Sequence, residues 1–415
     1  MGKEIDTSWD FKNQNTKEFT HCFHTYPAMM IPQVARRIIN EYGKKTKLLF
    51  DPYCGTGTSL VEANLNNIDS IGIDINPLAC LVAKAKTTPI SLQTLNLYLK
   101  DYNTFIFHVK HNMIDEISIV LPTFKNIDFW FEKSIQANLA QIKQYIDRIE
   151  EENIRNFFLV AFSETIRDCS WTKNSEFKLV RMNKEQIMKF KVDVFNTMDS
   201  KLFRNKKGMM QYLSDKSNGS YTRIYTLNTV KEIPNNIIED HSADLVITSP
   251  PYGDSRTTVA YGQFSRLSNQ WMGYENANQL DNEMMGGKRN NVEINSCSIH
   301  LKNTIRHIKE IDTERSKDVI SFFYDYKKSV DNVSKKIKKG GYACYVIGNR
   351  TVKGIQIPTS EITKDFFIEN GFMHVKTEIR NIPNKRMPSK NSPSNIKGKK
   401  SPTMKNEYIV ICKKD

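Results

Sequence analysis

A strand, a glycine-containing turn, a helix and a second strand follow one another near the start of the chain. The residues KLLF (47–50) predict a buried strand. The turn DPYCGTGT (51–58) contains two glycines and is followed by apolar residues at helical spacing. A second apolar run, SIGIDINP (70–77), passes an acidic residue and reaches a proline. Two such strands joined by a helix predict an α/β unit with parallel strands.

The second half of the chain returns to the same alternation. Between the two α/β parts, apolar residues repeat at 4-3-4-3 spacing from Ile135 to Ile149, which predicts an amphipathic helix inside a largely helical insertion at 91–215. Residues 1–90 and 216–415 are therefore expected to form one core around that insertion. Strands are expected at 223–227, 244–249, 341–349 and 406–414, and helices at 31–42, 154–168, 321–337 and 359–371.

Three segments show less pattern. Residues 1–23 are polar and are expected to be poorly ordered. Residues 254–318 have no clear period and predict a long loop region with some helix. Residues 381–406 are rich in lysine, arginine and proline and predict a basic loop before the last strand.

The glycine turn and the acidic end of the second strand suggest a ligand site. Gly55 and Gly57 allow a sharp turn and close approach to a ligand, although an ordinary strand–helix turn would have the same composition. Position 60 is Leu and no lysine follows the turn, so the phosphate-binding loops do not fit. Asp74 is placed to bind a ribose, or alternatively to cap the helix that starts near Pro77.

A third motif, Ser249-Pro250-Pro251-Tyr252, follows the strand expected at 244–249. The prolines cannot continue a β-ladder, and their fixed φ holds the turn rigidly. The Pro250 carbonyl and Ser249 then offer acceptors beside the flat ring of Tyr252. Such a group suits the orientation of an amino group on a planar heterocycle, whereas a proline turn on a surface loop is the plain alternative.

Together, DPYCGTG, IGIDINP and TSPPYG resemble the motifs of the amino-group DNA methyltransferases, and HTYPAMMIPQVARRII (24–39) resembles an additional cofactor-side motif of that family. The resemblance covers about 24–90 and 220–415, and implies a Rossmann-like class-I methyltransferase sheet and the cofactor S-adenosylmethionine. It implies cofactor contacts by Tyr26, Pro27, Asp51, Tyr53, Gly55, Gly57, Thr58 and Asp74. It implies that the target base is held by Ser249, Pro250, Pro251 and Tyr252.

The serine of SPPY resembles the members that methylate cytosine N4, with adenine N6 as the alternative. Methylation of RNA bases or of a protein glutamine, and a DNA-binding subunit with an inactive cofactor fold, are further alternatives. The third strand lacks the usual acidic end and offers Asn228 there. No Pro-Cys dipeptide is present, so the cysteine nucleophile of carbon-5 methylation is not indicated.

The resemblance implies duplex DNA as partner, with the base flipped into the cleft, and a restriction endonuclease of the same system as a further partner. The net charge of +14 fits contacts with phosphates. Sequence recognition is expected in 91–215, in 254–318 or in both. Candidate DNA-binding residues are Lys173, Arg181, Arg256, Arg266, Lys385 and Arg386.

The seven cysteines are scattered and form no C-x-x-C pair, which argues against a disulfide framework or a zinc site, and no other metal is expected. No apolar run approaches the ~20 residues of a membrane helix. The first residues lack an apolar signal segment, so a cytoplasmic location is expected.

Overall fold

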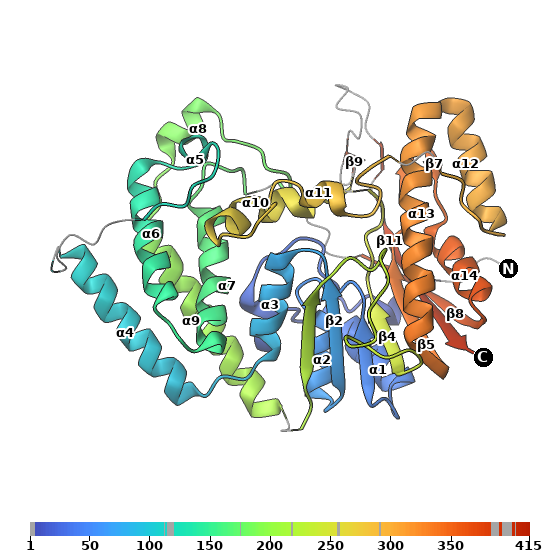
Figure 1. The fold of residues 1–415 in the computed structure, drawn as a ribbon, viewed down its shortest axis with the longest axis horizontal. Coiled ribbons are helices and arrows are strands. Elements are labelled where there is room, and N and C mark those ends of the chain that lie inside the picture. The colour runs from blue at the N-terminus through green and yellow to red at the C-terminus, as the bar shows by residue number, and fades with distance from the viewer. Residues whose placement is uncertain are drawn as a thin grey trace.

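A computed structural model describes residues 5–111, 113, 120–174, 176–216, 219–254, 258–289, 292–382, 390–391, 401–402 and 404–415. Its centre is a seven-stranded sheet in the order β3-β2-β1-β4-β5-β11-β8 (Figure 1). The first five strands in that order are parallel to their neighbours, and β11 runs antiparallel to both β5 and β8. The strands are β1 (Leu48–Asp51), β2 (Asp69–Asp74), β3 (Thr222–Thr226), β4 (Ala243–Thr248), β5 (Ile337–Ile347), β8 (Phe372–Asn381) and β11 (Asn406–Lys414).

Helices cover both faces of this sheet. The helices of the core are α1 (Pro32–Tyr42), α2 (Thr58–Leu65), α3 (Pro77–Thr87), α10 (Tyr261–Trp271), α11 (Leu280–Glu283), α12 (Ile299–Ile311), α13 (Thr313–Lys336) and α14 (Thr359–Glu369). Short elements are η1 (Thr7–Trp9), η2 (Phe19–Phe23), and two antiparallel ribbons, β6 (Thr351–Val352) with β7 (Ile355–Gln356), and β9 (Lys390–Asn391) with β10 (Ser401–Pro402).

The alternation of side chains along the central strands forms two of the three hydrophobic clusters. Leu49 and Leu245 point to the face covered by α1 and α2, whereas Phe50 and Val246 point to the face covered by α13 and α14. All four side chains are fully buried. A strand that is buried on both faces has apolar residues at consecutive positions. This continuous apolar run is the reason that the central strands could be predicted from the sequence.

The segment between α3 and β3 forms a helical block, which we define as residues 92–215. It lies beside α3 on the left of Figure 1, and α10 and α11 run between it and the sheet. One hydrophobic cluster extends from α3 through the block to α10, so the block and the core share buried surface. Its helices are α4 (Leu92–Lys110), α5 (Ile127–Trp130), α6 (Lys133–Asp147), α7 (Glu152–Asp168), α8 (Lys184–Lys189) and α9 (Val194–Asp215).

The structure departs from the sequence-based expectations at three places, and at residues 254–318 the departure is that helices make up more of the region than expected. Residues 254–318 contain the helices α10 and α12 and the start of α13, because Phe264, Leu267 and Trp271 form an apolar stripe diluted by serines. Residues 5–23 are ordered, because the side chain of Trp9 is fully buried. Strand β8 was missed, because its first half alternates poorly and is exposed.

The described part of the chain adds three negative observations. No helix within it is long and apolar enough to cross a membrane. No group of three or more His, Cys, Asp or Glu side chains within it is arranged to hold a metal ion. The seven cysteines are free thiols, and five of them are buried.

Candidate active site

A cleft with about 900 Å³ of empty space lies at the carboxyl ends of β1, β2 and β4. This is the edge at which doubly wound sheets bind their ligands. Most of the residues assigned to the site from the sequence border the cleft: Tyr26, Pro27, Asp51, Tyr53, Gly55, Thr58, Asp74, Ser249 and Pro251. Gly57, Pro250 and Tyr252 lie outside its lining.

Asp51, the last residue of β1, forms the floor of this cleft. Its Oδ1 accepts hydrogen bonds from the Tyr53 N–H (3.1 Å) and from Thr248 Oγ1 (2.5 Å), and Ser59 donates to its Oδ2. Burial raises the pKa of the carboxyl from 3.8 to about 6, although these three hydrogen bonds favour the charged form. A buried carboxylate of this kind is suited to a cationic group of a ligand.

Asp74, at the end of β2, is a second buried carboxyl in the cleft. Its Oδ2 accepts a hydrogen bond from the Gly55 N–H (3.0 Å) and its Oδ1 accepts one from the Asn76 N–H (2.8 Å). Burial raises its pKa to about 6 as well. The alternative role as helix cap is wrong, because the side chain of Asn76 caps α3 through the Leu78 N–H.

The two glycines of the turn have different tasks. Gly55 has a φ of +50°, and a Cβ built on it would meet no protein atom within 4 Å, so the backbone there faces the open cleft. Gly57 has a φ of +78°, and a Cβ would lie 2.9 Å from the Cβ of Ala83. Gly57 therefore allows α2 to pack against α3, and its contribution to the site is indirect.

The SPPY turn leaves β4 at the other side of the cleft. Ser249 Oγ lies 3.2 Å from the hydroxyl of Tyr252, which donates a hydrogen bond to Glu407 Oε1 on β11 (3.2 Å). Glu407 Oε2 in turn accepts from Arg380 Nη1 on β8 (2.6 Å). The tyrosine is thus held from behind by the antiparallel edge of the sheet. Sequence reasoning missed Glu407, because nothing in its local pattern links it to the turn.

An aromatic wall closes one side of the cleft. The rings of Tyr26 and Tyr261 are stacked, with centroids 5.8 Å apart and planes at 14°. The Tyr26 hydroxyl accepts a hydrogen bond from Asn76 Nδ2 (2.7 Å), and Phe264 meets the Tyr26 ring edge to face. Tyr261 was not assigned to the site, since it begins α10 in the region expected to be a loop. Its spacing from Phe264 is the signal that was available.

At the end of β3, Asn228 occupies the place where the family usually has an acidic residue. Asn228 lines the cleft together with Leu227 and Thr229. Its side chain donates to the Glu283 carbonyl (3.0 Å) and accepts from the Val230 N–H (3.0 Å), so it fixes a local turn. The other cleft residues that were not assigned from the sequence are Ala28, Met29, Met30, Pro52, Cys54, Thr56, Ile75, Met284 and Met285.

Three of the six candidate DNA-binding residues lie within the described part of the chain. Arg181 Nε donates to the Phe129 carbonyl (2.7 Å), and its guanidinium lies over the rings of Phe129 and Trp171, so it stabilises the helical block. Arg266 lies on α10, 4.0 Å from the carboxylate of Asp281. Lys173 is half-buried in the helical block. Arg256, Lys385 and Arg386 lie outside the described residues.

Relatives of known class match this chain. The model of the N6_N4_Mtase family, described as DNA methylase, matches residues 1–85. The type II methyltransferase M.MvaI of Kocuria varians is 40% identical over 97% of this chain and 93% of its own. The type II methyltransferase M.MjaII of Methanocaldococcus jannaschii is 34% identical over 24% of this chain and 20% of its own. The rRNA methyltransferase aviRa of Streptomyces viridochromogenes aligns over 94% of this chain and 88% of its own, at 9% identity and a TM-score of 0.33, which supports no argument.

The sheet order and the ligand cleft at its carboxyl edge define a Rossmann-like class-I methyltransferase. With a relative matching nearly its whole length, the chain belongs to the amino-group DNA methyltransferase family. Its methyl donor is S-adenosylmethionine, as predicted from the motifs. The cleft fits this donor, because it combines the buried carboxyls Asp51 and Asp74 with open space at Gly55 and an aromatic wall.

Proposed function

We propose that this DNA methyltransferase transfers the methyl group to the N4 amino group of cytosine in a specific duplex sequence. The position of the SPPY turn carries the proposal. Ser249 and Pro251 border the same cleft as Asp51 and Asp74, so an amino group held at the turn would face the methyl donor. Bound there, the donor supplies an electrophilic methyl group.

Each part of the cleft then has a chemical task. Asp51 would pair with the ammonium of the methionine part, and Asp74 would accept hydrogen bonds from the ribose hydroxyls. Tyr26 and Tyr261 offer a flat surface to the cofactor side. The Ser249 side chain and the Pro250 carbonyl would accept hydrogen bonds from the amino group, aim its lone pair and leave its proton to solvent.

The choice of cytosine rests on the serine of SPPY. An amino group in a duplex is out of reach, so the base must be flipped into the cleft, which costs a few kcal/mol. Stacking on Tyr252 is proposed to offset part of that cost. The Tyr252 hydroxyl is fixed by Ser249 and Glu407, which supports a role in orienting the ring rather than in proton transfer.

Mass analysis of nucleosides tests the proposal. Duplex DNA methylated by the purified protein is digested, and N4-methylcytosine is expected. Detection of N6-methyladenine instead would show that the target base is adenine. If a protein that binds S-adenosylmethionine forms neither product, the proposal is overturned. Methylated RNA or a methylated glutamine under the same conditions would assign a different substrate.

The variant Tyr252→Ala tests the division of the cleft. We expect the KM for DNA to rise by about tenfold or more, since loss of a base–aromatic stack costs 1–3 kcal/mol. The Kd for S-adenosylmethionine, measured by calorimetry, is expected to stay within about twofold, because Tyr252 lies outside the cleft lining. Equal losses of both affinities would contradict the assigned roles.

A further inference from the structure

We propose that Glu164 of the helical block is a positioning residue for the cofactor, because it holds the segment 23–27 that forms one wall of the cleft. The helical block would then complete the cofactor site, in addition to any part in DNA recognition. This inference rests on the assignment of the cleft to S-adenosylmethionine.

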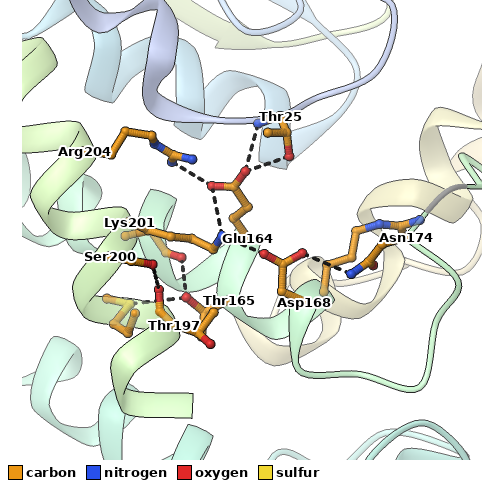
Figure 2. Close-up of polar contacts among 12 residues, drawn as sticks. Thr25, Glu164, Thr165, Asp168, Asn174, Thr197, Ser200, Lys201 and Arg204 are labelled. Carbon is orange, nitrogen blue, oxygen red and sulfur yellow. Dashed lines mark hydrogen bonds and ion pairs between the residues drawn. The ribbon is translucent and has the colours of Figure 1, made fainter. Parts of the chain in front are cut away.

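The contacts of Glu164 join two parts of the chain that are distant in sequence. Its Oε1 accepts hydrogen bonds from the backbone N–H of Thr25 (3.1 Å) and from Thr25 Oγ1 (2.6 Å) (Figure 2). Its Oε2 accepts one from Arg204 Nη2 on α9 (2.6 Å). The same nitrogen of Arg204 donates to the Phe23 carbonyl (2.7 Å). One carboxylate and one guanidinium therefore fix the backbone on both sides of His24.

His24 itself cannot hold the segment by hydrogen bonds. Its ring is buried against Tyr26 and Phe264, and neither ring nitrogen has a hydrogen-bond partner among the described residues. Burial lowers the pKa of His24 to about 4, so the ring is neutral at physiological pH. The polar anchoring of this segment to α7 and α9 consequently depends on Glu164 and Arg204.

The anchored segment leads directly into the cleft. Tyr26 and Pro27, the last two residues of the segment, both line it. The Tyr26 ring is fixed by stacking on Tyr261 and by the hydrogen bond from Asn76. A shift of the backbone at residue 25 would therefore move the aromatic wall, and displacements of about 1 Å are enough to weaken a bound ligand.

The charge on Glu164 is secure. Burial alone would raise its pKa, but the charges of Arg204 and Lys201 outweigh that effect and hold the pKa below its usual range. The side chain is 4% exposed. Its anchoring hydrogen bonds are therefore made by an ionised acceptor, a type worth more than a neutral pair.

Asp168 provides a matched control on the same helix. It lies one turn after Glu164 and forms an ion pair with Lys201 (2.6 Å), which also lies 3.8 Å from Glu164. Asp168 accepts a further hydrogen bond from Asn174, whereas the described hydrogen bonds of Thr25 go to Glu164 (Figure 2). Asp168→Asn thus perturbs the same charged cluster without releasing the wall of the cleft.

The experiment compares full-length variants by calorimetry with S-adenosylmethionine and by steady-state kinetics. Glu164→Ala is expected to raise the Kd and KM for the cofactor about tenfold or more, and Thr25→Val about threefold to tenfold. In both, kcat at saturating cofactor and the KM for DNA are expected to stay within about twofold. Asp168→Asn is expected to leave all four values within about twofold.

Three results would overturn the inference: unchanged cofactor affinity in folded Glu164→Ala or Thr25→Val, an equal loss in Asp168→Asn, or a change confined to the KM for DNA. Thr25 is exposed, so Thr25→Val carries the test even if Glu164→Ala fails to fold. A further variant, Asp74→Asn, distinguishes failure of this inference from failure of the assignment on which it rests. Unchanged cofactor affinity in Asp74→Asn would mean that the cleft is not the cofactor site.

Discussion

Asp51→Asn is expected to stabilise the protein without cofactor, and increasingly so as pH rises. The side chain is 2% exposed, and its folded-state pKa of about 6 lies above the ordinary value of 3.8. The folded protein thus binds a proton more tightly than the unfolded chain, so unfolding becomes easier as pH rises between these values and stays easier above them. An asparagine amide has no such titration.

The surroundings accept the amide. The asparagine oxygen can accept from the Tyr53 N–H and from Thr248, and its NH₂ can donate to Ser59, whose hydroxyl rotates. This titration is expected to destabilise the wild type by about 1–2 kcal/mol at about pH 5 and by about 3 kcal/mol at about pH 8. The difference in unfolding free energy between variant and wild type should therefore widen by about 1–2 kcal/mol between these two pH values.

Urea unfolding of both proteins at the two pH values, without cofactor, measures this difference. Asp325→Asn serves as a control. Burial also raises the pKa of the Asp325 carboxyl, but this residue lies outside the cleft lining. A difference that stays constant or narrows with pH would refute the reasoning. The same Asp51→Asn variant should bind S-adenosylmethionine more weakly at about pH 8, because the proposed partner of its ammonium is gone.

Three further results are expected. In urea unfolding, Gly57→Ala should lower the unfolding free energy by about 1–3 kcal/mol more than Gly273→Ala does, because both positions have positive φ but only a Cβ at position 57 would meet a neighbouring Cβ. Equal losses of unfolding free energy would contradict this. Glu407→Gln should lower kcat about tenfold through Tyr252 while calorimetry finds cofactor affinity unchanged, and a matching loss of affinity would argue against it. Trp9→Ala should lower the unfolding free energy by about 3–5 kcal/mol, and a loss below about 1 kcal/mol would show that the segment is dispensable.

The central strands and the polar centre of the cleft were predictable because their signals are local. Strands buried on both faces are continuous apolar runs, and Asp51, Gly55 and Asp74 stand directly after such runs. The serine and second proline of SPPY reach the cleft for the same reason. These residues share one edge because the carboxyl ends of parallel strands meet there.

The remaining features depend on contacts between distant segments. Glu407 and Tyr261 join the site through the packing of β11 and α10, which no local period indicates. Trp9 is ordered by the N-terminal segment meeting β8, where Arg380 Nε donates to its carbonyl. Glu164 looks like one more polar residue of a buried helix until the fold brings it to Thr25.

The order of the strands has a consequence for synthesis. In β1, Leu49 pairs on one side with Ser70 and on the other with Leu245. Leu245 is translated about 200 residues after Leu49, which takes about 10–40 s at ordinary ribosome speed. Throughout that interval, in which the whole helical block is synthesised, the inner edge of β1 has no partner strand. The nascent chain, rather than the finished enzyme, is therefore the form most exposed to edge-to-edge aggregation.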